Sequence, residues 1–201
     1  MRAFTALSAL AFSVLVAAPA FAQAPAAPAT PPPPAMVLTS TSFPDGGQIP
    51  VKYTQAGPGV AAGEGTSPAL NWTNAPPGTQ SFVLHVHDLE GARNKTTDDV
   101  LHWLVWPIPA TTTSLPEGVA RGAKLADGSY QVSATGPVFR GPGAPATGPM
   151  HHYTFEIYAL DNMPAVEPAA DAYETRTKVL AAIQGHILGK AVYSGLFRRP
   201  N

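Results

Sequence analysis

QSFVLHVHDL, residues 80–89, contains the alternation that decides the fold class. In an extended chain every second side chain lies on the same face of the strand. Phe82, Leu84 and Val86 therefore form an apolar row, and Asp88 continues that row as its charged end. The stretch predicts a β-strand with one face in a protein core and a carboxylate at the edge of that core.

Six other runs of strand length are apolar or β-branched and are separated by clusters of Gly, Pro, Asn and Asp. These runs are residues 36–43, 48–54, 101–108, 128–133, 151–160 and 191–197. Residues 174–184 favour a helix, because Val179, Leu180 and Ile183 are apolar at helical spacing and Gly185 can end it. Many short strands with one late helix predict a mainly β protein, an antiparallel β-sandwich with a C-terminal helix.

Alternation also places a histidine in the second long strand. In residues 101–108, His102 is expected on the same face as Leu104, Trp106 and Ile108. This assignment assumes a strand without a bulge, since an extra residue would move every following side chain to the other face.

A third strand repeats the arrangement. In residues 151–159, His151 and Tyr153 precede two apolar residues of the same face. Asp88, His102, His151 and Tyr153 thus each continue an apolar face at a strand end. A buried carboxylate is costly unless it is paired, and two imidazoles are suitable partners. We therefore expect a pocket at one edge of the core.

Motifs along the chain resemble the bacterial branch of the phosphatidylethanolamine-binding protein family, often labelled Raf-kinase-inhibitor-like. The similarity extends from about residue 37 to the C-terminus. The motifs, in chain order, are SPALNW (67–72) with APPGTQS (75–81), DLEGA (88–92), LHWLVWPIP (101–109), and GPGAP (141–145) followed by HHYTF (151–155).

The resemblance implies a sandwich of that family's type and a pocket for a small anion bearing phosphate or carboxylate, such as a phospholipid headgroup. It implies a binding protein rather than an enzyme, with no metal or other cofactor. Histidine N–H groups suit an oxyanion, and a glycine lets a ligand approach the backbone. The expected pocket residues are Asp88, Glu90, His102, Gly141, Pro142, His151 and Tyr153.

The chain departs from the family pattern beside these residues. Leu89 replaces a signature proline, Glu90 replaces a shorter acid, and His152 replaces an arginine on the outward face. Gly143 and Ala144 stand where many bacterial members have Cys-Pro. The shape of the entrance and the choice of ligand are therefore the features that the resemblance predicts least.

Two enzymatic interpretations have weaker support. His85 and His87, followed by Glu90, are similar to the His-x-His and acid pattern of cupin metal sites. The spacing to the acid is too short for that pattern, and no distant further ligand stands out. Paired histidines on a strand are more often polar residues that face solvent. A hydrolase would need a nucleophile beside a base, and no serine lies in such a motif.

A third class of function is a protein-interaction or inhibitor module, for instance one that inhibits an extracytoplasmic protease. Such a partner could use the pocket or the proline-rich segment 23–35. The sequence leaves open whether the chain forms a homodimer.

The N-terminus predicts export. Arg2 precedes an uncharged apolar run, and Ala20-Phe21-Ala22 is a signal-peptidase pattern, so residues 1–22 are expected to be a cleaved signal peptide. Residues 23–35 are almost wholly Ala and Pro and predict a semi-rigid linker. Residues 36–201 form the expected domain, periplasmic or secreted and without stable membrane insertion after cleavage.

Composition excludes several classes. The chain has 12 Lys and Arg residues against 13 Asp and Glu residues, so it lacks the basic surface that nucleic acid requires. It has no cysteine, which excludes a disulfide framework and thiolate zinc sites. The stability of the domain must therefore come from packing.

Overall fold

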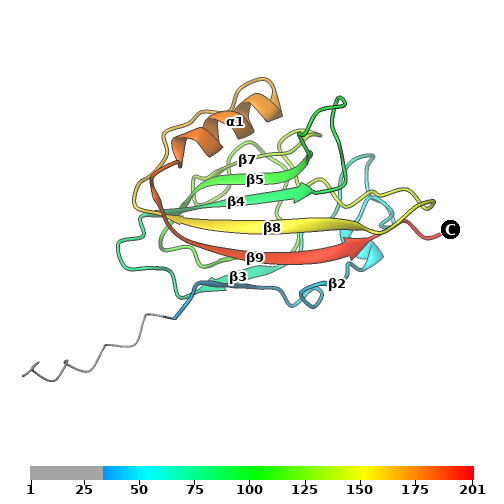
Figure 1. Ribbon diagram of the computed structural model, residues 1–201, viewed down its shortest axis with the longest axis horizontal. Coiled ribbons are helices and arrows are strands. Elements are labelled where there is room, and N and C mark those ends of the chain that lie inside the picture. The colour runs from blue at the N-terminus through cyan, green and yellow to red at the C-terminus, as the bar shows by residue number, and fades with distance from the viewer. Residues whose placement is uncertain (1–33) are drawn as a thin grey trace, which may run out of the picture. The chain divides into compact units, whose positions relative to one another are not determined.

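The structure is a computed structural model that describes residues 34–201. The predicted signal peptide and nearly all of the predicted linker lie outside the described residues. Within that range two sheets face each other and a helix covers the outer face of the larger sheet (Figure 1). The prediction of a mainly β sandwich with a C-terminal helix is confirmed.

The small sheet contains three strands in the order β1-β3-β6, and the large sheet six in the order β2-β9-β8-β4-β5-β7, within residues 34–201. Only β2 and β9 pair in parallel among the described strands. The bounds are β1 Val37–Thr39, β2 Gly47–Gln48, β3 Leu70–Thr73, β4 Ser81–Asp88, β5 Val100–Pro109, β6 Ser114–Leu115, β7 Tyr130–Val132, β8 His151–Leu160, α1 Ala172–Ala182 and β9 Ile187–Phe197.

Two apolar clusters hold these layers together. Between the sheets, Leu70 and Trp72 of β3 pack in one cluster with the row from β4 that begins at Phe82. On the outer face, Val179 of α1 packs in a second cluster with Val83 of β4. Burial of each fully enclosed apolar side chain contributes about 1.5–3 kcal/mol. Alternate residues of β4 therefore pack in two different apolar clusters, one on each face of the sheet.

One predicted strand is wrong. Residues 48–54 form only the end of β2, and a 3-10 helix then covers Val51–Tyr53. Pro50 has a φ of −60° and no N–H, so it ends the strand and starts a tight turn. The N–H of Tyr53 donates to the Pro50 carbonyl at 3.0 Å, and Tyr53 is buried. The apolar residues of this run thus reach the core from a helix.

Other differences concern short or capped elements. β3 and β6 were not predicted because four and two residues give too little alternation. α1 starts two residues earlier than expected, since Asp171 caps it by accepting the N–H groups of Tyr173 at 2.7 Å and Glu174 at 2.9 Å. Gly185, with a φ of +81°, follows the helix as predicted.

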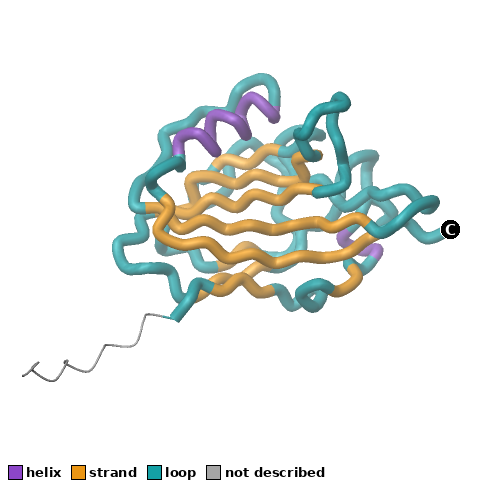
Figure 2. The backbone as a smooth tube through the Cα atoms, viewed as in Figure 1, coloured by secondary structure: helices purple, strands orange, loops and turns teal. Residues whose placement is uncertain are grey.

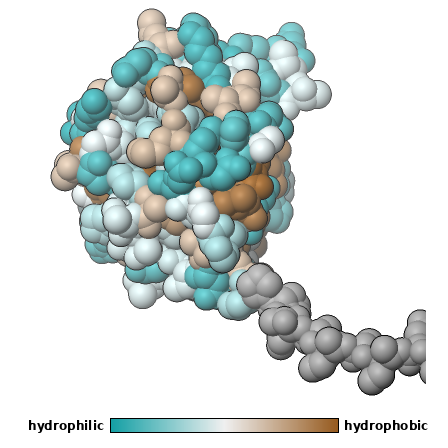
Figure 3. Space-filling view, turned by 90° about the vertical axis from the view of Figure 1, so that its left-hand side faces the viewer, coloured by the Kyte–Doolittle hydropathy of each residue, from teal (hydrophilic) through white to brown (hydrophobic). Residues whose placement is uncertain are grey.

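Loops join the strands at both ends of the large sheet (Figure 2). One long loop follows the end of β4, and another precedes the start of β8. The face shown in Figure 3 mixes hydrophilic and hydrophobic residues, and a hydrophobic area lies toward its right-hand side. Within residues 34–201, no helix has the length and apolar character needed to cross a membrane.

Candidate functional site

Asp88 ends the inner row of β4, as the alternation predicts. Its partner across the sheet is Tyr153 of β8, and its side chain is buried. Nδ1 of His151 lies 2.9 Å and 3.1 Å from the two carboxylate oxygens of Asp88. Because a carboxylate only accepts, Nδ1–H of His151 donates to it, and Nε2 is left for other partners. The expected pairing of a buried acid with an imidazole is present.

His102 reaches the same region through a β-bulge. Trp103 pairs with Val86 and Leu101 pairs with His87, so His102 is an extra residue without an opposite partner. In such a bulge two consecutive side chains share one face. His102 therefore lies on the inner face beside Trp103, and its ring meets the Tyr153 ring edge to face at 5.0 Å.

The bulge corrects the predicted face of β5. Leu104 and Trp106 pack in the outer cluster under α1, whereas Ile108 returns to the inner cluster after a second register shift. His102 does not share a face with Leu104 and Trp106. Alternation without a bulge would have put His102 on the outer face with Leu104, and the bulge places it on the inner face instead.

The protonation of His102 is set by burial and by one backbone carbonyl. Nδ1 lies 2.8 Å from the carbonyl oxygen of Arg140, so Nδ1 carries the hydrogen and donates. Burial lowers the pKa of His102 to about 4, although Asp88 and the carbonyl act in the opposite direction. At neutral pH the ring is uncharged, and its Nε2 is an acceptor.

Tyr153 holds the neighbouring loop in place. Its ring is buried in the inner cluster, and its hydroxyl oxygen accepts the N–H groups of Gly143 at 3.1 Å and Ala144 at 3.0 Å. Burial raises the pKa of Tyr153 to about 12. The hydroxyl is thus engaged by the backbone, and Tyr153 positions the loop instead of presenting its hydroxyl to a ligand.

Gly141 and Pro142 belong to the same loop and fix it to the segment that contains Gln55. A Cβ on Gly141 would lie 2.7 Å from the carbonyl oxygen of Glu64, so only glycine fits this approach. Gln55 donates from its backbone N–H to the Pro142 carbonyl at 2.9 Å and from Nε2 to the Gly141 carbonyl at 2.8 Å. The glycine allows close packing of two protein segments, and neither residue lines the cavity described below.

Glu90 lies at the rim. Its carboxylate accepts the backbone N–H of His152 at 2.7 Å and contacts Nδ1 of His152 at 2.5 Å. Burial opposes ionisation, and the hydrogen bonds from His152 outweigh it and lower the pKa of Glu90. The backbone N–H of Glu90 donates to Asp88 at 3.0 Å. Glu90 therefore supports Asp88 from outside the cavity.

A cavity of about 200 Å³ opens where these residues meet. It is lined by Gln55, Asp88, Gly91, Val100, His102, Arg140, Gly143, Ala144, Pro145 and His151. Three of the seven predicted residues thus line it, namely Asp88, His102 and His151. The loop that forms one wall of the cavity is positioned by Tyr153, Gly141 and Pro142, which do not line the cavity themselves.

Sequence reasoning missed two polar lining residues, Gln55 and Arg140. The Nε of Arg140 is buried and has no hydrogen-bond partner among the described residues. Its position directly before the predicted Gly141 loop could have drawn attention to it. Gln55 lies in no quoted motif and reaches the site only through the fold.

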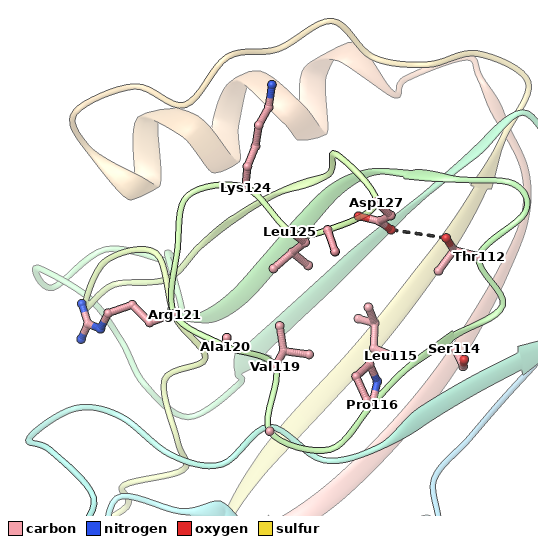
Figure 4. Close-up of a pocket in the computed structure, with 12 residues that line it drawn as sticks. Thr112, Ser114, Leu115, Pro116, Val119, Ala120, Arg121, Lys124, Leu125 and Asp127 are labelled. Carbon is pink, nitrogen blue, oxygen red and sulfur yellow. Dashed lines mark hydrogen bonds between the residues drawn. The ribbon is translucent and has the colours of Figure 1, made fainter.

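A larger cavity, of about 440 Å³, lies elsewhere along the segment 112–127 (Figure 4). Its walls include Leu115, Val119 and Leu125, and the hydroxyl of Thr112 donates to Asp127 at its edge at 3.3 Å. No histidine lines this cavity. The smaller cavity is the better candidate site because several titratable groups converge on it.

The outer face of β4 differs from the expectation. His85 is 5% exposed and its ring stacks on that of His87 at 4.3 Å. The interpretation of this pair as solvent-facing polar residues is wrong. α1 packs on this face of the sheet, and its Arg176 is ion-paired with Asp99, which contacts His87.

The pocket can therefore bind a group that has both acceptor and donor atoms. The guanidinium of Arg140 supplies positive N–H donors, whereas neutral His102 offers an acceptor to an acidic hydroxyl. A hydrogen phosphate group has both features. A carboxylate would use the donors alone.

Comparison with known proteins agrees with this architecture. The sequence model of a family described as phosphatidylethanolamine-binding protein matches residues 39–198. A UPF0098 protein of Methanothermobacter thermautotrophicus is 37% identical over 166 residues, which are 82% of this chain and 99% of that protein.

Two solved structures are similar over most of the chain. One is the Escherichia coli protein YbcL, described as a new member of the mammalian PEBP family. It has a TM-score of 0.66 at 29% identity, over 82% of this chain and 99% of its own. A phosphatidylethanolamine-binding protein homologue of Chlamydia trachomatis has a TM-score of 0.66 at 28% identity over 83% of this chain and 99% of its own.

Proposed function

Since this chain belongs to the phosphatidylethanolamine-binding protein family, we propose that it binds a small phosphate- or carboxylate-bearing ligand, such as a phospholipid headgroup, in the cavity beside Asp88. The resemblance predicted from the motifs is confirmed at the level of the family. The observation that carries the proposal is the convergence of Asp88, His102, His151 and Arg140 on one cavity of about 200 Å³.

Charge and hydrogen bonding favour an anion over a neutral ligand. Arg140 has a buried N–H group without a protein acceptor, and leaving it unpaired costs about 1–3 kcal/mol or more. An oxyanion in the cavity would satisfy that donor.

The size of the cavity limits the ligand. A volume of about 200 Å³ is below the range of about 300–1,000 Å³ that is typical of drug-sized ligands. It suits a headgroup, or an isolated phosphate or carboxylate, and leaves any acyl chains outside. We propose binding without catalysis, because the polar groups of the cavity engage one another or a ligand and none is a nucleophile held beside a base.

We also propose that the protein acts outside the cytoplasm. The support is the N-terminal pattern: an apolar run, a small-x-small site at residues 20–22, and a proline-rich segment before the domain. Expression in a bacterial host followed by N-terminal sequencing of the periplasmic fraction tests this. Export predicts a mature chain that begins at Gln23, and recovery of the uncleaved chain from the cytoplasm alone would reject it.

Thermal shift of the purified chain tests ligand binding. Phosphate, phosphoethanolamine, glycerophosphate and acetate are added at about pH 6 and about pH 8. A ligand that binds only the folded chain raises its stability by about 2.7 kcal/mol at 100 times Kd. Acetate is a monoanion at both values, so a larger shift with acetate at the lower pH reports protonation of the protein.

The arms of this experiment separate the outcomes. A shift with phosphate and phosphoethanolamine, stronger than that with acetate, supports a phosphate site. Equal shifts with free phosphate and phosphoethanolamine show that the ethanolamine makes no contact. The absence of a shift with every anion would reject the proposal and turn attention to a protein partner.

A further inference from the structure

The outer face of β4 holds a second polar cluster that the anion cavity does not use. His85 lies directly opposite Glu156 of β8 in the sheet register, and His87 stands two residues further along the same face. The two imidazole planes are 16° from parallel. Glu156 is the distant acid that sequence analysis did not find, because 69 residues separate it from His87.

The donor atoms of these three side chains converge. Nδ1 of His85 lies 3.7 Å, and Nε2 of His87 lies 3.6 Å, from the same carboxylate oxygen, Oε2 of Glu156. Two ligand atoms of a tetrahedral Zn²⁺ with bonds of about 2.1 Å are about 3.4 Å apart. Small side-chain adjustments would therefore place all three atoms around one ion.

A second carboxylate orients His87. Its Nδ1 is hydrogen-bonded to Asp99, and Asp99 is itself ion-paired with Arg176 of α1. This chain of contacts turns Nε2 of His87 toward Glu156. Metal-bound histidines commonly have their other ring nitrogen held by a carboxylate in this way, which fixes the tautomer and raises the basicity of the ligand.

Some nitrogens of the cluster have no protein partner. The Nε2 atoms of His85 and His87 are buried and make no hydrogen bond to any described residue. A buried polar atom without a partner is destabilising. A bound ion would give Nε2 of His87 a partner.

We propose that His85, His87 and Glu156 bind one divalent transition-metal ion of the Zn²⁺ class. Two imidazoles and a carboxylate suit Zn²⁺ and leave a fourth position for water. A cavity of about 370 Å³ lined by His85, Asp99 and Arg176 gives that position an approach from the side of α1. Asp99 is a positioning residue that acts through His87.

The cation would compete with two groups that already contact Glu156. The Tyr158 hydroxyl donates to Oε2 of Glu156 at 2.5 Å. Lys190 contacts the other oxygen of Glu156 at 2.5 Å, and it is 42% exposed and free to turn outward.

Metal analysis of the purified chain, prepared without a histidine tag, tests the proposal. The chain is stripped with a chelator, incubated with ZnCl₂ and desalted, and its zinc content and affinity are measured. We expect about one zinc ion per chain, lost in His87→Gln and in Glu156→Gln. Asp99→Asn should bind zinc about 10–100-fold more weakly.

Matched controls use histidines outside the cluster. His186→Ala removes an exposed histidine paired with Asp161 at 2.7 Å, and it should retain full zinc. His151→Asn should also retain it, since His151 belongs to the inner cavity. Circular dichroism and a melting curve establish that each variant folds, and Glu156→Gln supplies the test if His87→Gln does not.

Three results would overturn the proposal: a chain that binds no zinc, full zinc in both His87→Gln and Glu156→Gln, or zinc lost only in His151→Asn. The last would place the ion beside Asp88 and Glu90, whose carboxylates also lie within 4.8 Å of a His151 nitrogen. The first result would identify the cluster as an ion-pair network without a metal, and the second would place the zinc at another part of the chain.

Discussion

His87 and Asp88 are consecutive in β4, yet their side chains belong to polar clusters on opposite faces of the six-stranded sheet. Asp88 pairs with His151 beside the anion cavity, and His87 pairs with Asp99 under α1. The sheet backbone separates the two clusters, so one side chain can be changed without removing a contact of the other. The alternation of a strand thus places neighbouring residues in two separate polar clusters.

Substitution of His151 by asparagine should abolish or greatly weaken anion binding while leaving the fold intact. The asparagine Nδ2 can occupy the place of Nδ1 and keep Asp88 paired, whereas the Nε2 atom is lost. We expect phosphate affinity to fall at least about tenfold, which is about 1.4 kcal/mol. Isothermal titration measures it, and unchanged affinity would remove His151 from the site.

Arg140 should contribute to anion affinity through its guanidinium. Arg140→Lys keeps the charge and loses the Nε–H donor, and Arg140→Gln loses both. We expect phosphate affinity to decrease in the order arginine, lysine, glutamine, with the last about 1.5–3 kcal/mol weaker. The hydrogen bond from the His102 ring to the backbone carbonyl of Arg140 is retained in both variants. Equal affinity in all three chains would contradict the assignment.

Sequence patterns predicted the elements in which local alternation and burial agree. β4 and β8 are long and regular, so the inner positions of Asp88, His151 and Tyr153 followed from counting residues. The motifs identified the family because they keep their order along the chain. Short strands such as β6 have too few residues for such a pattern.

The rest depends on contacts between distant segments. The bulge at His102 arises from the pairing of β5 with β4, and Gln55 reaches the cavity by packing on the 141–142 backbone. Glu156 meets His85 only because β8 and β4 are neighbours in the sheet. A single sequence carries no local signal for these contacts, which are set by register and tertiary packing.

Acid should destabilise the chain through His102. Burial holds its pKa near 4 in the folded state, below the value of about 6.5 for an exposed histidine, so the unfolded chain binds the proton more readily. This contribution is fully present above about pH 6.5 and is lost as the pH falls toward 4, a loss of about 3 kcal/mol.

Urea unfolding across that pH range measures the effect, with His102→Asn as the comparison. Asparagine can still donate to the Arg140 carbonyl, and it does not titrate. The difference in unfolding free energy between the two chains should shrink as the pH falls. A difference that stays constant from neutral pH to pH 4 would show that His102 is not held neutral by burial.

Tyr153→Phe should loosen the wall of the anion cavity. The ring and its packing remain, but the N–H groups of Gly143 and Ala144 lose their acceptor. We expect a loss of about 1–3 kcal/mol in unfolding free energy together with weaker phosphate binding. Tyr130→Phe is the matched control, because its hydroxyl bonds exposed Glu167 far from the cavity, and it should change stability by less than about 0.5 kcal/mol. If Tyr153→Phe lowered stability without affecting phosphate, the loop would not take part in binding. If neither quantity changed, Tyr153 would not hold the loop at all.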